Sequence, residues 1–289
     1  MQFDEQFRAM DTDVDVALQT WAPAFDATLS VRLLFERQEA AFSRFRPESL
    51  LSALNRGETV TDAGFVQACR MAIQAFEMTG GLFNPMVLPA LREAGYDRTF
   101  AEVRGGSPRR QDVPDPRSCL DFGESGVRLR SGALDLGGIV KGWTVDLAVE
   151  LLADRFDGVL VNAGGDLRCS GGEEPGAPGW TVEIEGPDGT LAWEGTWMGA
   201  LATSTVAKRR WVAAAQGEAH HLIDPRTGLP AESGYAQVST RGALTWRAEV
   251  WAKAVLIGGP ELATLAAGQG HGVLAIAPDG HIEAWNWER

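Results

Sequence analysis

Residues 134–146 combine several groups that favour the binding of a phosphate. An apolar run ends at Gly137 and Gly138, Lys141 follows, and the next residues have helical spacing. Glycines let a backbone approach a ligand closely, the N–H groups at a helix start attract anions, and the lysine adds a full positive charge. The segment lacks the four-residue spacer and the Ser or Thr of a Walker A loop. It therefore indicates either a phosphate cradle or an ordinary strand–turn–helix corner.

Further segments place polar or charged side chains near predicted turns or on one helix face. They are Asn162–Asp166, Ala202–Thr205 followed by Lys208–Arg210, His220–Gly228, and Ala248–Ala254. Each also has a simpler interpretation: a turn, a solvated run of charge, or a surface ion pair between Glu249 and Lys253. The chain has only four histidines, and adjacent residues point to opposite sides of a strand. We therefore expect one of His220 and His221 to belong to a site.

Length and charge limit the possible partners. A chain of 289 residues can bury a sizeable core, as one large domain or two fused lobes. The net charge of −13 argues against nucleic acid and against an anionic membrane, so an anionic ligand would need a local positive pocket. The cysteines are Cys69, Cys119 and Cys169; their odd number and wide spacing indicate ordinary burial in a reducing compartment.

The N-terminal residues carry no basic region, no apolar core and no cysteine suited to lipid attachment. No apolar run of about 18 residues, the length needed to span a bilayer, occurs anywhere. We therefore expect a cytoplasmic protein, unless a leader has been removed from the product.

Strands and helices are predicted without regular βαβ alternation, which favours an α+β fold. Strands are expected at 7–18, 158–162 and 180–185, helices at 25–45, 62–79 and 246–258, polar loops at 104–118 and 171–179, and a hairpin from 273–277 to 281–287. The side chains expected to face the interior are Val14, Val16 and Leu18; Leu29, Leu33, Leu34 and Ala41; Phe65, Cys69, Ala72 and Phe76; and Val145, Ala148, Leu151 and Leu152.

In this order and spacing, the segments resemble the FAD:protein FMN transferase family, also called ApbE-like. The family pattern reads Asp-Leu-Gly-Gly-Ile-Ala-Lys-Gly, then Asn-x-Gly-Gly-Asp, Ala-Thr-Ser-Gly, His-x-Ile-Asp-Pro-Arg-Thr-Gly and Ala-Asp-Ala-Leu-Ala-Thr-Ala. Similar stretches at 9–12, 42–55 and 79–85 extend the resemblance over nearly the whole chain. It implies a single domain over residues 1–289, with mixed or antiparallel sheets flanked by helices and an FAD cleft between two lobes.

The resemblance implies an activity. Members of the family bind FAD and a divalent metal, usually magnesium. They transfer FMN through its phosphate to a threonine or serine of an acceptor protein and release AMP, and some instead hydrolyse FAD to FMN and AMP. FAD is thus the expected substrate and an acceptor protein the expected partner. An FAD-binding protein without catalysis and an FAD pyrophosphatase remain as alternatives.

The resemblance also assigns residues to roles. His221 would orient the pyrophosphate or donate a proton to it, Lys141 would neutralise phosphoryl oxygens, and Asp224 would hold the histidine or order its loop. The implied FAD-binding residues are Met10, Asn55, Phe83, Gly137, Gly138, Lys141, Gly164, Gly165, Asp166, Thr203, Ser204 and His221.

Two departures from the family pattern concern the metal. The family holds it with an Asp, a Thr four residues later, and a backbone carbonyl near the Gly-Gly turn, which is here that of Val140. Glu249 and Lys253 stand at the Asp and Thr positions. Magnesium takes oxygen ligands, and a protonated ammonium group has no lone pair to offer. Lys253 would therefore repel a metal, take its place and neutralise phosphate itself; if a metal still binds, Val140 and Glu249 are its expected ligands. Other departures are Asp11, Asn84, Val140 and Thr205, which together indicate a divergent member.

Overall fold

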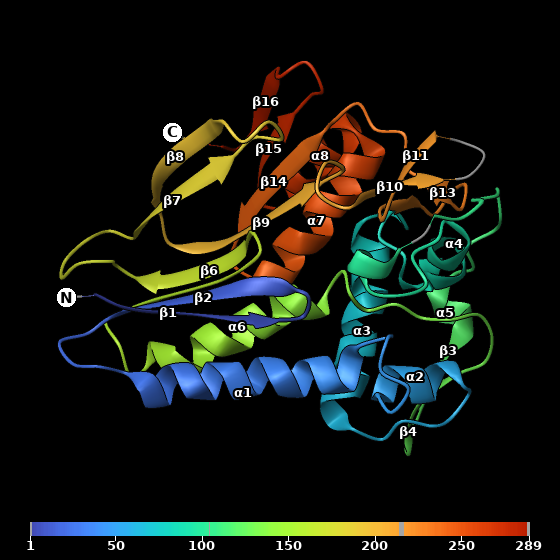
Figure 1. Ribbon diagram of the computed structural model, residues 1–289, viewed down its shortest axis with the longest axis horizontal. Helices are drawn as coiled ribbons and strands as arrows, with labels where there is room; N and C mark the ends of the chain where they lie inside the picture. Colours follow the sequence, from blue (N-terminus) through green and yellow to red (C-terminus); the bar gives the residue numbers. More distant parts are fainter. Residues whose placement is uncertain (1, 104, 214–216, 288–289) are drawn as a thin grey trace.

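The computed structural model describes residues 2–103, 105–213 and 217–287 (Figure 1). Its central feature is an eight-stranded sheet of order β1-β2-β5-β6-β9-β14-β15-β16, in which every neighbouring pair is antiparallel. The strands are β1 (Gln2–Ala9), β2 (Thr12–Gln19), β5 (Gly158–Ala163), β6 (Asp166–Gly171), β9 (Gly199–Thr205), β14 (Gln237–Gly242), β15 (Gly272–Ile276) and β16 (Ile282–Trp285).

Smaller hairpins and helices complete the fold. The two-stranded sheets pair β3 (Leu120–Gly123) with β4 (Gly126–Leu129), β7 (Trp180–Glu185) with β8 (Leu191–Trp197), β10 (Arg210–Ala213) with β11 (Gly217–His220), and β12 (Ile223–Asp224) with β13 (Leu229–Pro230). The α-helices are α1 (Phe25–Phe42), α2 (Leu50–Asn55), α3 (Ala63–Met78), α4 (Leu88–Glu93), α5 (Pro116–Cys119), α6 (Val140–Ala153), α7 (Thr245–Gly258) and α8 (Pro260–Gly268), with 3-10 turns at Pro85–Val87 and Phe100–Glu102.

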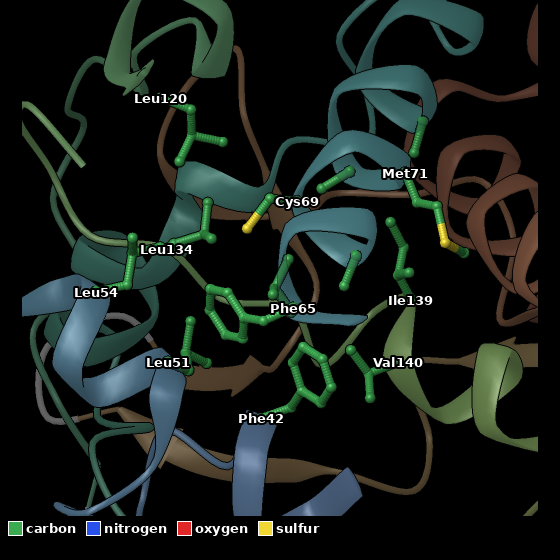
Figure 2. Packing of buried hydrophobic residues seen from close by; sticks show 14 of the residues in the cluster. Phe42, Leu51, Leu54, Phe65, Cys69, Met71, Leu120, Leu134, Ile139 and Val140 are labelled. Carbon is green, nitrogen blue, oxygen red and sulfur yellow. The ribbon is translucent and has the colours of Figure 1, made fainter. Parts of the chain in front are cut away.

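The elements form layers around two central helices. α6 packs on β5 and β6, α7 packs on β9 and β14, and the two helices contact each other. α1 packs on α6 as an outer layer, while α2 to α5 gather with β3 and β4 at one end of the molecule (Figure 1). Figure 2 shows a core that joins this end to α6: Phe42, Leu51 and Phe65 pack against Leu134, Ile139 and Val140. The expected α+β class with antiparallel sheets is confirmed.

The N-terminal segment is a hairpin, so the prediction of one strand over 7–18 is wrong. Met10 and Asp11 have φ of 51° and 58°, and this pair of left-handed residues makes a tight type I′ turn between β1 and β2. Neither residue is a glycine, so the usual turn signal was missing from the sequence. The expected inner face is nevertheless correct, since Val14, Val16 and Leu18 are buried.

α1 ends earlier and faces differently than the sequence suggested. The helix stops at Phe42 rather than residue 45, because Ser43 is extended. Its buried side chains include Ala27, Val31 and Phe35, whereas Leu29 and Leu33 are 51% and 55% exposed, so their predicted inward orientation is wrong. Leu151 of α6 is likewise exposed, and the other predicted inner residues of that helix are buried.

α6 and α7 approach each other closely at Gly142. A Cβ there would lie 2.9 Å from Oε2 of Glu249 and 2.9 Å from Cα of Trp246, so only glycine fits between the helices. α7 lacks a side-chain cap of its own. Instead, the buried Asp146 carboxylate on α6 accepts the N–H groups of Thr245 (2.8 Å) and Trp246 (3.1 Å). The two helices are therefore fastened together at the start of α7.

Several other predicted elements agree with the structure. α3 lies within the predicted helix 62–79 and is capped by Asp62, α7 matches 246–258, and β15 and β16 form the C-terminal hairpin. The loop 104–118 also contains the start of α5. All three cysteines are buried and unpaired. No helix in the part of the chain that the structure describes is long and apolar enough to cross a membrane.

Candidate functional site

Lys141 lies in the first turn of α6 and connects the helix to the β5–β6 turn. Its Nζ donates to the carbonyl oxygen of Ala163 at 3.0 Å and forms an ion pair with Asp166. The Asp166 side chain is 2% exposed and that of Lys141 is 22% exposed, so the carboxylate lies behind the ammonium group. Burial raises the pKa of Asp166 to about 6, although the Lys141 charge opposes this.

The β5–β6 turn is built from the predicted glycines. Gly164 and Gly165 have φ of 61° and 93°, which non-glycine residues rarely adopt. A Cβ on Gly164 would lie 2.1 Å from Oγ1 of Thr12, so the turn packs directly on the start of β2. The Gly165 carbonyl accepts the N–H of Thr203 at 3.1 Å, which brings β9 to the same place.

Glu249 and Lys253 form an ion pair along α7. Oε1 of Glu249 lies 2.9 Å from Nζ of Lys253, and Oε2 accepts the Gly142 N–H at 3.0 Å. The side chain of Glu249 is 1% exposed and that of Lys253 is 20% exposed. Burial alone would raise the pKa of Glu249, yet the charges of Lys253 and Lys141 hold it below its ordinary value. This pair is therefore buried, unlike the surface pair that the spacing alone suggested.

Lys253 extends across the first glycine turn. A Cβ on Gly138 would lie 3.4 Å from Cε of Lys253 and 2.9 Å from Cε2 of Phe83, so these side chains meet at that glycine. The Gly137 N–H donates to Oδ1 of Asp135 at 2.7 Å, which shapes the turn before α6. The structure thus brings together the two lysines, the glycine turn and Phe83.

The adjacent histidines have different surroundings. Nε2 of His220 lies 2.9 Å from the Ala231 carbonyl oxygen. Burial, reinforced by the charges of Arg209 and Lys253, lowers the pKa of His221 well below its ordinary value, so its ring is neutral at pH 7. Its Nδ1 atom is buried and has no hydrogen-bond partner among the residues described. His221 is therefore the histidine that the Lys253 charge reaches.

Asp224 orders its own loop. Its carboxylate accepts the backbone N–H of Arg226 at 2.9 Å and pairs with the Arg226 guanidinium, while its carbonyl accepts the Gly228 N–H at 2.8 Å. Hydrogen bonds to His221 are absent from its contacts in the described ranges. Of the two roles expected for Asp224, the geometry favours the ordering of residues 224–228.

Other expected FAD contacts are engaged within the protein. Asn55 holds the Leu134 backbone through both ends of its amide, at 3.0 and 2.7 Å. The Met10 N–H donates to Oε2 of Glu39 at 2.7 Å. The Thr203 hydroxyl lies 2.8 Å from that of Ser239, and Ser204 is buried on β9. These residues position the strands and turns that surround the lysines, and their direct contact with FAD stays a prediction.

The donor set does not fit a magnesium ion. Both oxygens of Glu249 are occupied, one of them by an ammonium group, and the Val140 carbonyl accepts the Thr144 hydroxyl at 2.7 Å. Within the described part of the chain, no group of three or more His, Cys, Asp and Glu side chains is arranged to hold a metal. Magnesium needs several oxygen ligands in octahedral geometry.

One positioning pair was missed by sequence reasoning. Nε of Arg44 lies 3.1 Å from Oδ2 of Asp135, whose other oxygen shapes the Gly137 turn. The Arg44 side chain is 7% exposed and lies over the rings of Phe45 and Tyr96. Asp135 lies inside the first motif, but its partner is 91 residues earlier, and nothing local in the sequence indicates the contact.

Comparisons with known proteins agree with this arrangement. A family model described as the ApbE family matches residues 10–276. The FAD:protein FMN transferase of Treponema pallidum is 30% identical over 292 aligned residues, covering 87% of this chain and 77% of that protein. The FAD:protein FMN transferase of Vibrio cholerae is 30% identical over 132 residues, covering 44% of this chain and 39% of that protein.

Solved structures show the same fold. The ApbE protein of Thermotoga maritima has a TM-score of 0.88 at 22% identity, over 99% of this chain and 97% of its own. The flavinyl transferase ApbE of Pseudomonas stutzeri has a TM-score of 0.81 at 21% identity, over 99% of this chain and 96% of its own. The family model spans most of the chain, and the structure brings Lys141 to the β5–β6 turn and Lys253 to the Gly137–Gly138 turn. This chain belongs to the ApbE family.

Proposed function

We propose that this chain is an FAD:protein FMN transferase, which moves FMN from FAD to a serine or threonine hydroxyl of an acceptor protein and releases AMP. The observation that supports this most directly is that Lys253 lies against Gly138 and that Lys141 follows the same turn, while the Lys253 charge also helps to lower the pKa of His221. The Treponema pallidum relative, whose name states this activity, supports it further.

The two lysines suit a pyrophosphate. An ammonium group has three N–H donors. Lys141 directs donors at Asp166 and Ala163, and Lys253 directs one at Glu249, so within the described residues each keeps donor capacity for phosphoryl oxygens. Neutralising the charge on these oxygens lowers the barrier to attack and stabilises the departing phosphate.

The transfer step is a substitution at phosphorus. The acceptor hydroxyl oxygen attacks the FMN phosphorus, the bond from that phosphorus to the bridging oxygen breaks, and AMP leaves with that oxygen. His221 is neutral at pH 7, so its ring takes up the hydroxyl proton or orients the pyrophosphate rather than acting as a preformed imidazolium acid. Because the residues present do not fit magnesium, no step is assigned to a metal.

The test is to incubate the purified chain with FAD and a protein that accepts FMN from the Treponema pallidum relative, in EDTA and in magnesium. AMP is measured by chromatography and covalent flavin by fluorescence of the denatured acceptor. We expect both products in equal amounts, and their loss in His221→Gln. The matched control is His281→Gln, an exposed histidine of the C-terminal hairpin.

The same assay separates the alternative functions. AMP without covalent flavin would identify an FAD pyrophosphatase, in which water replaces the hydroxyl. Bound FAD without AMP release would identify an FAD-binding protein without catalysis. The Glu249–Lys253 pair is the observation in favour of this alternative, because a single ammonium charge polarises phosphoryl oxygen less than a dication does. Either result would overturn the transferase proposal.

A further inference from the structure

The geometry points to Lys253 as a built-in cation of the pyrophosphate site, so that this chain binds FAD without a divalent metal. This inference rests on the proposed function, since it names the group that neutralises the FAD phosphates. It concerns binding, however, and it can fail while the transferase proposal stands.

The ammonium group is anchored at the position that a cation would need. Glu249 is almost completely buried, and its two oxygens are satisfied by Nζ of Lys253 and the N–H of Gly142. A dication at this carboxylate would have to displace the lysine, and the displaced ammonium would still repel it at short range. With Lys253 in place, the carboxylate needs no further counter-ion.

The four charges are layered by depth. The carboxylates of Asp166 and Glu249 are 2% and 1% exposed, whereas the side chains of Lys141 and Lys253 are 22% and 20% exposed. The two carboxylates are thus buried beneath the two ammonium groups, and the more exposed groups of the cluster carry positive charge. The four charges sum to zero, but the two ammonium groups are the ones that an anionic ligand can reach, even though the chain as a whole carries a net charge of −13.

The Lys253 side chain lies against Gly138. Its Cδ and Cε would be in ordinary van der Waals contact with a Cβ at Gly138, at 3.5 and 3.4 Å, whereas Cε2 of Phe83 would lie at 2.9 Å and so limits this position to glycine. The ammonium group is held beside the first turn of α6, because its partner Glu249 also accepts the Gly142 N–H there.

The test uses isothermal titration calorimetry of FAD and of riboflavin, which has no phosphate, in EDTA and in millimolar magnesium. Wild-type protein is compared with Glu249→Gln/Lys253→Met, which removes both charges and leaves no buried ion unpaired. The matched control, Asp121→Asn/Arg130→Met, removes an exposed ion pair of 3.0 Å on the β3–β4 hairpin. A third variant, Glu249→Asp/Lys253→Thr, replaces the ammonium with oxygen donors.

We expect wild-type protein to bind FAD equally in EDTA and in magnesium. The neutral double variant should bind FAD about tenfold more weakly, the loss of one charge-assisted contact, with riboflavin binding unchanged. The Glu249→Asp/Lys253→Thr variant should bind magnesium directly and require it for FAD.

Specific results would overturn the inference. FAD binding by the wild type only in magnesium would overturn it and leave the transferase proposal intact. Equal weakening of FAD and riboflavin binding in the Glu249→Gln/Lys253→Met variant would also overturn it, by showing that the pair supports the surrounding structure rather than contacting phosphate. Absence of FAD binding by the wild type in both buffers would overturn the inference and the proposed function together.

Discussion

Nζ of Lys253 lies 2.9 Å from Oε1 of Glu249, one helical turn away on α7, and the glutamate is 1% exposed. Removing the lysine alone would leave a buried carboxylate without its partner. We expect Lys253→Met to lower the free energy of unfolding by about 3–5 kcal/mol, and Glu249→Gln/Lys253→Met to recover most of that loss. Urea denaturation followed by tryptophan fluorescence measures both; equal losses in the two variants would show that the pair contributes through packing alone.

Asp146 should be essential for the start of α7. Its carboxylate accepts two N–H groups at the helix N-terminus, where the backbone otherwise lacks partners. We expect Asp146→Ala to destabilise the protein by about 2 kcal/mol, in the range of a lost charged cap. The control Asp154→Ala changes an exposed aspartate at the end of α6 and should shift stability by about 0.5 kcal/mol or less. Similar effects of both changes on thermal unfolding would contradict the capping role.

Stability should depend on pH through His221. Its pKa in the folded chain lies well below the 6.5 of an ordinary histidine, chiefly because of burial. As the pH falls, His221 therefore takes up a proton in the unfolded chain before it does so in the folded chain, which favours unfolding. The neutral, buried His221 does not reduce the free energy of unfolding above pH 6.5, but it lowers that free energy progressively below pH 6.5. Over the first pH unit below 6.5, wild-type protein should lose about 1 kcal/mol more than His221→Gln in chemical denaturation. Parallel pH profiles for the two proteins would show that the histidine titrates normally.

A glycine at position 11, in the β1–β2 turn, should stabilise the protein. Asp11 adopts a φ of 58°, which glycine accepts without strain, and its ion pairs with Arg8 and Arg209 are exposed and long. We expect Asp11→Gly to raise the free energy of unfolding by about 0.5 kcal/mol.

The same change at Asp13 provides the control. Asp13 lies in β2 and is exposed, so a glycine there should lower the free energy of unfolding by about 0.5–1 kcal/mol. Changes of the same sign at both positions would show that lost ion pairs, rather than backbone conformation, dominate in this turn.

Local patterns predicted the parts of this fold that depend on local forces. Helical spacing predicted α3 and α7, and the glycine pairs predicted the turns at 137–138 and 164–165. The prediction that Leu29 and Leu33 face the interior was wrong because it used only their apolar character. The buried face of α1 is the one that packs on α6, which lies more than 100 residues later in the chain.

The site was predictable in its residue types but not in its pairings. The partners of Asn55, Lys141 and Glu249 lie 79, 25 and 107 residues away, respectively. Long-range contacts of this kind leave no periodic signal in a single sequence. The spacing of Glu249 and Lys253 predicted an ion pair, and the structure contains it. The sequence indicated a pair on the surface, however, whereas in the structure Glu249 is buried because α6 packs against it.

Gly142 sets how closely α6 and α7 can approach each other. Lys141 precedes it on α6, and Lys253 is tied to Glu249, whose Oε2 accepts the Gly142 N–H. Even one methyl group at this point would act as a wedge between the helices, because three atoms of α7 would lie within 2.9 Å of it. The close contact at Gly142 therefore sets the distance between α6 and α7, and a larger residue at this position would move Lys141 and Lys253 further apart.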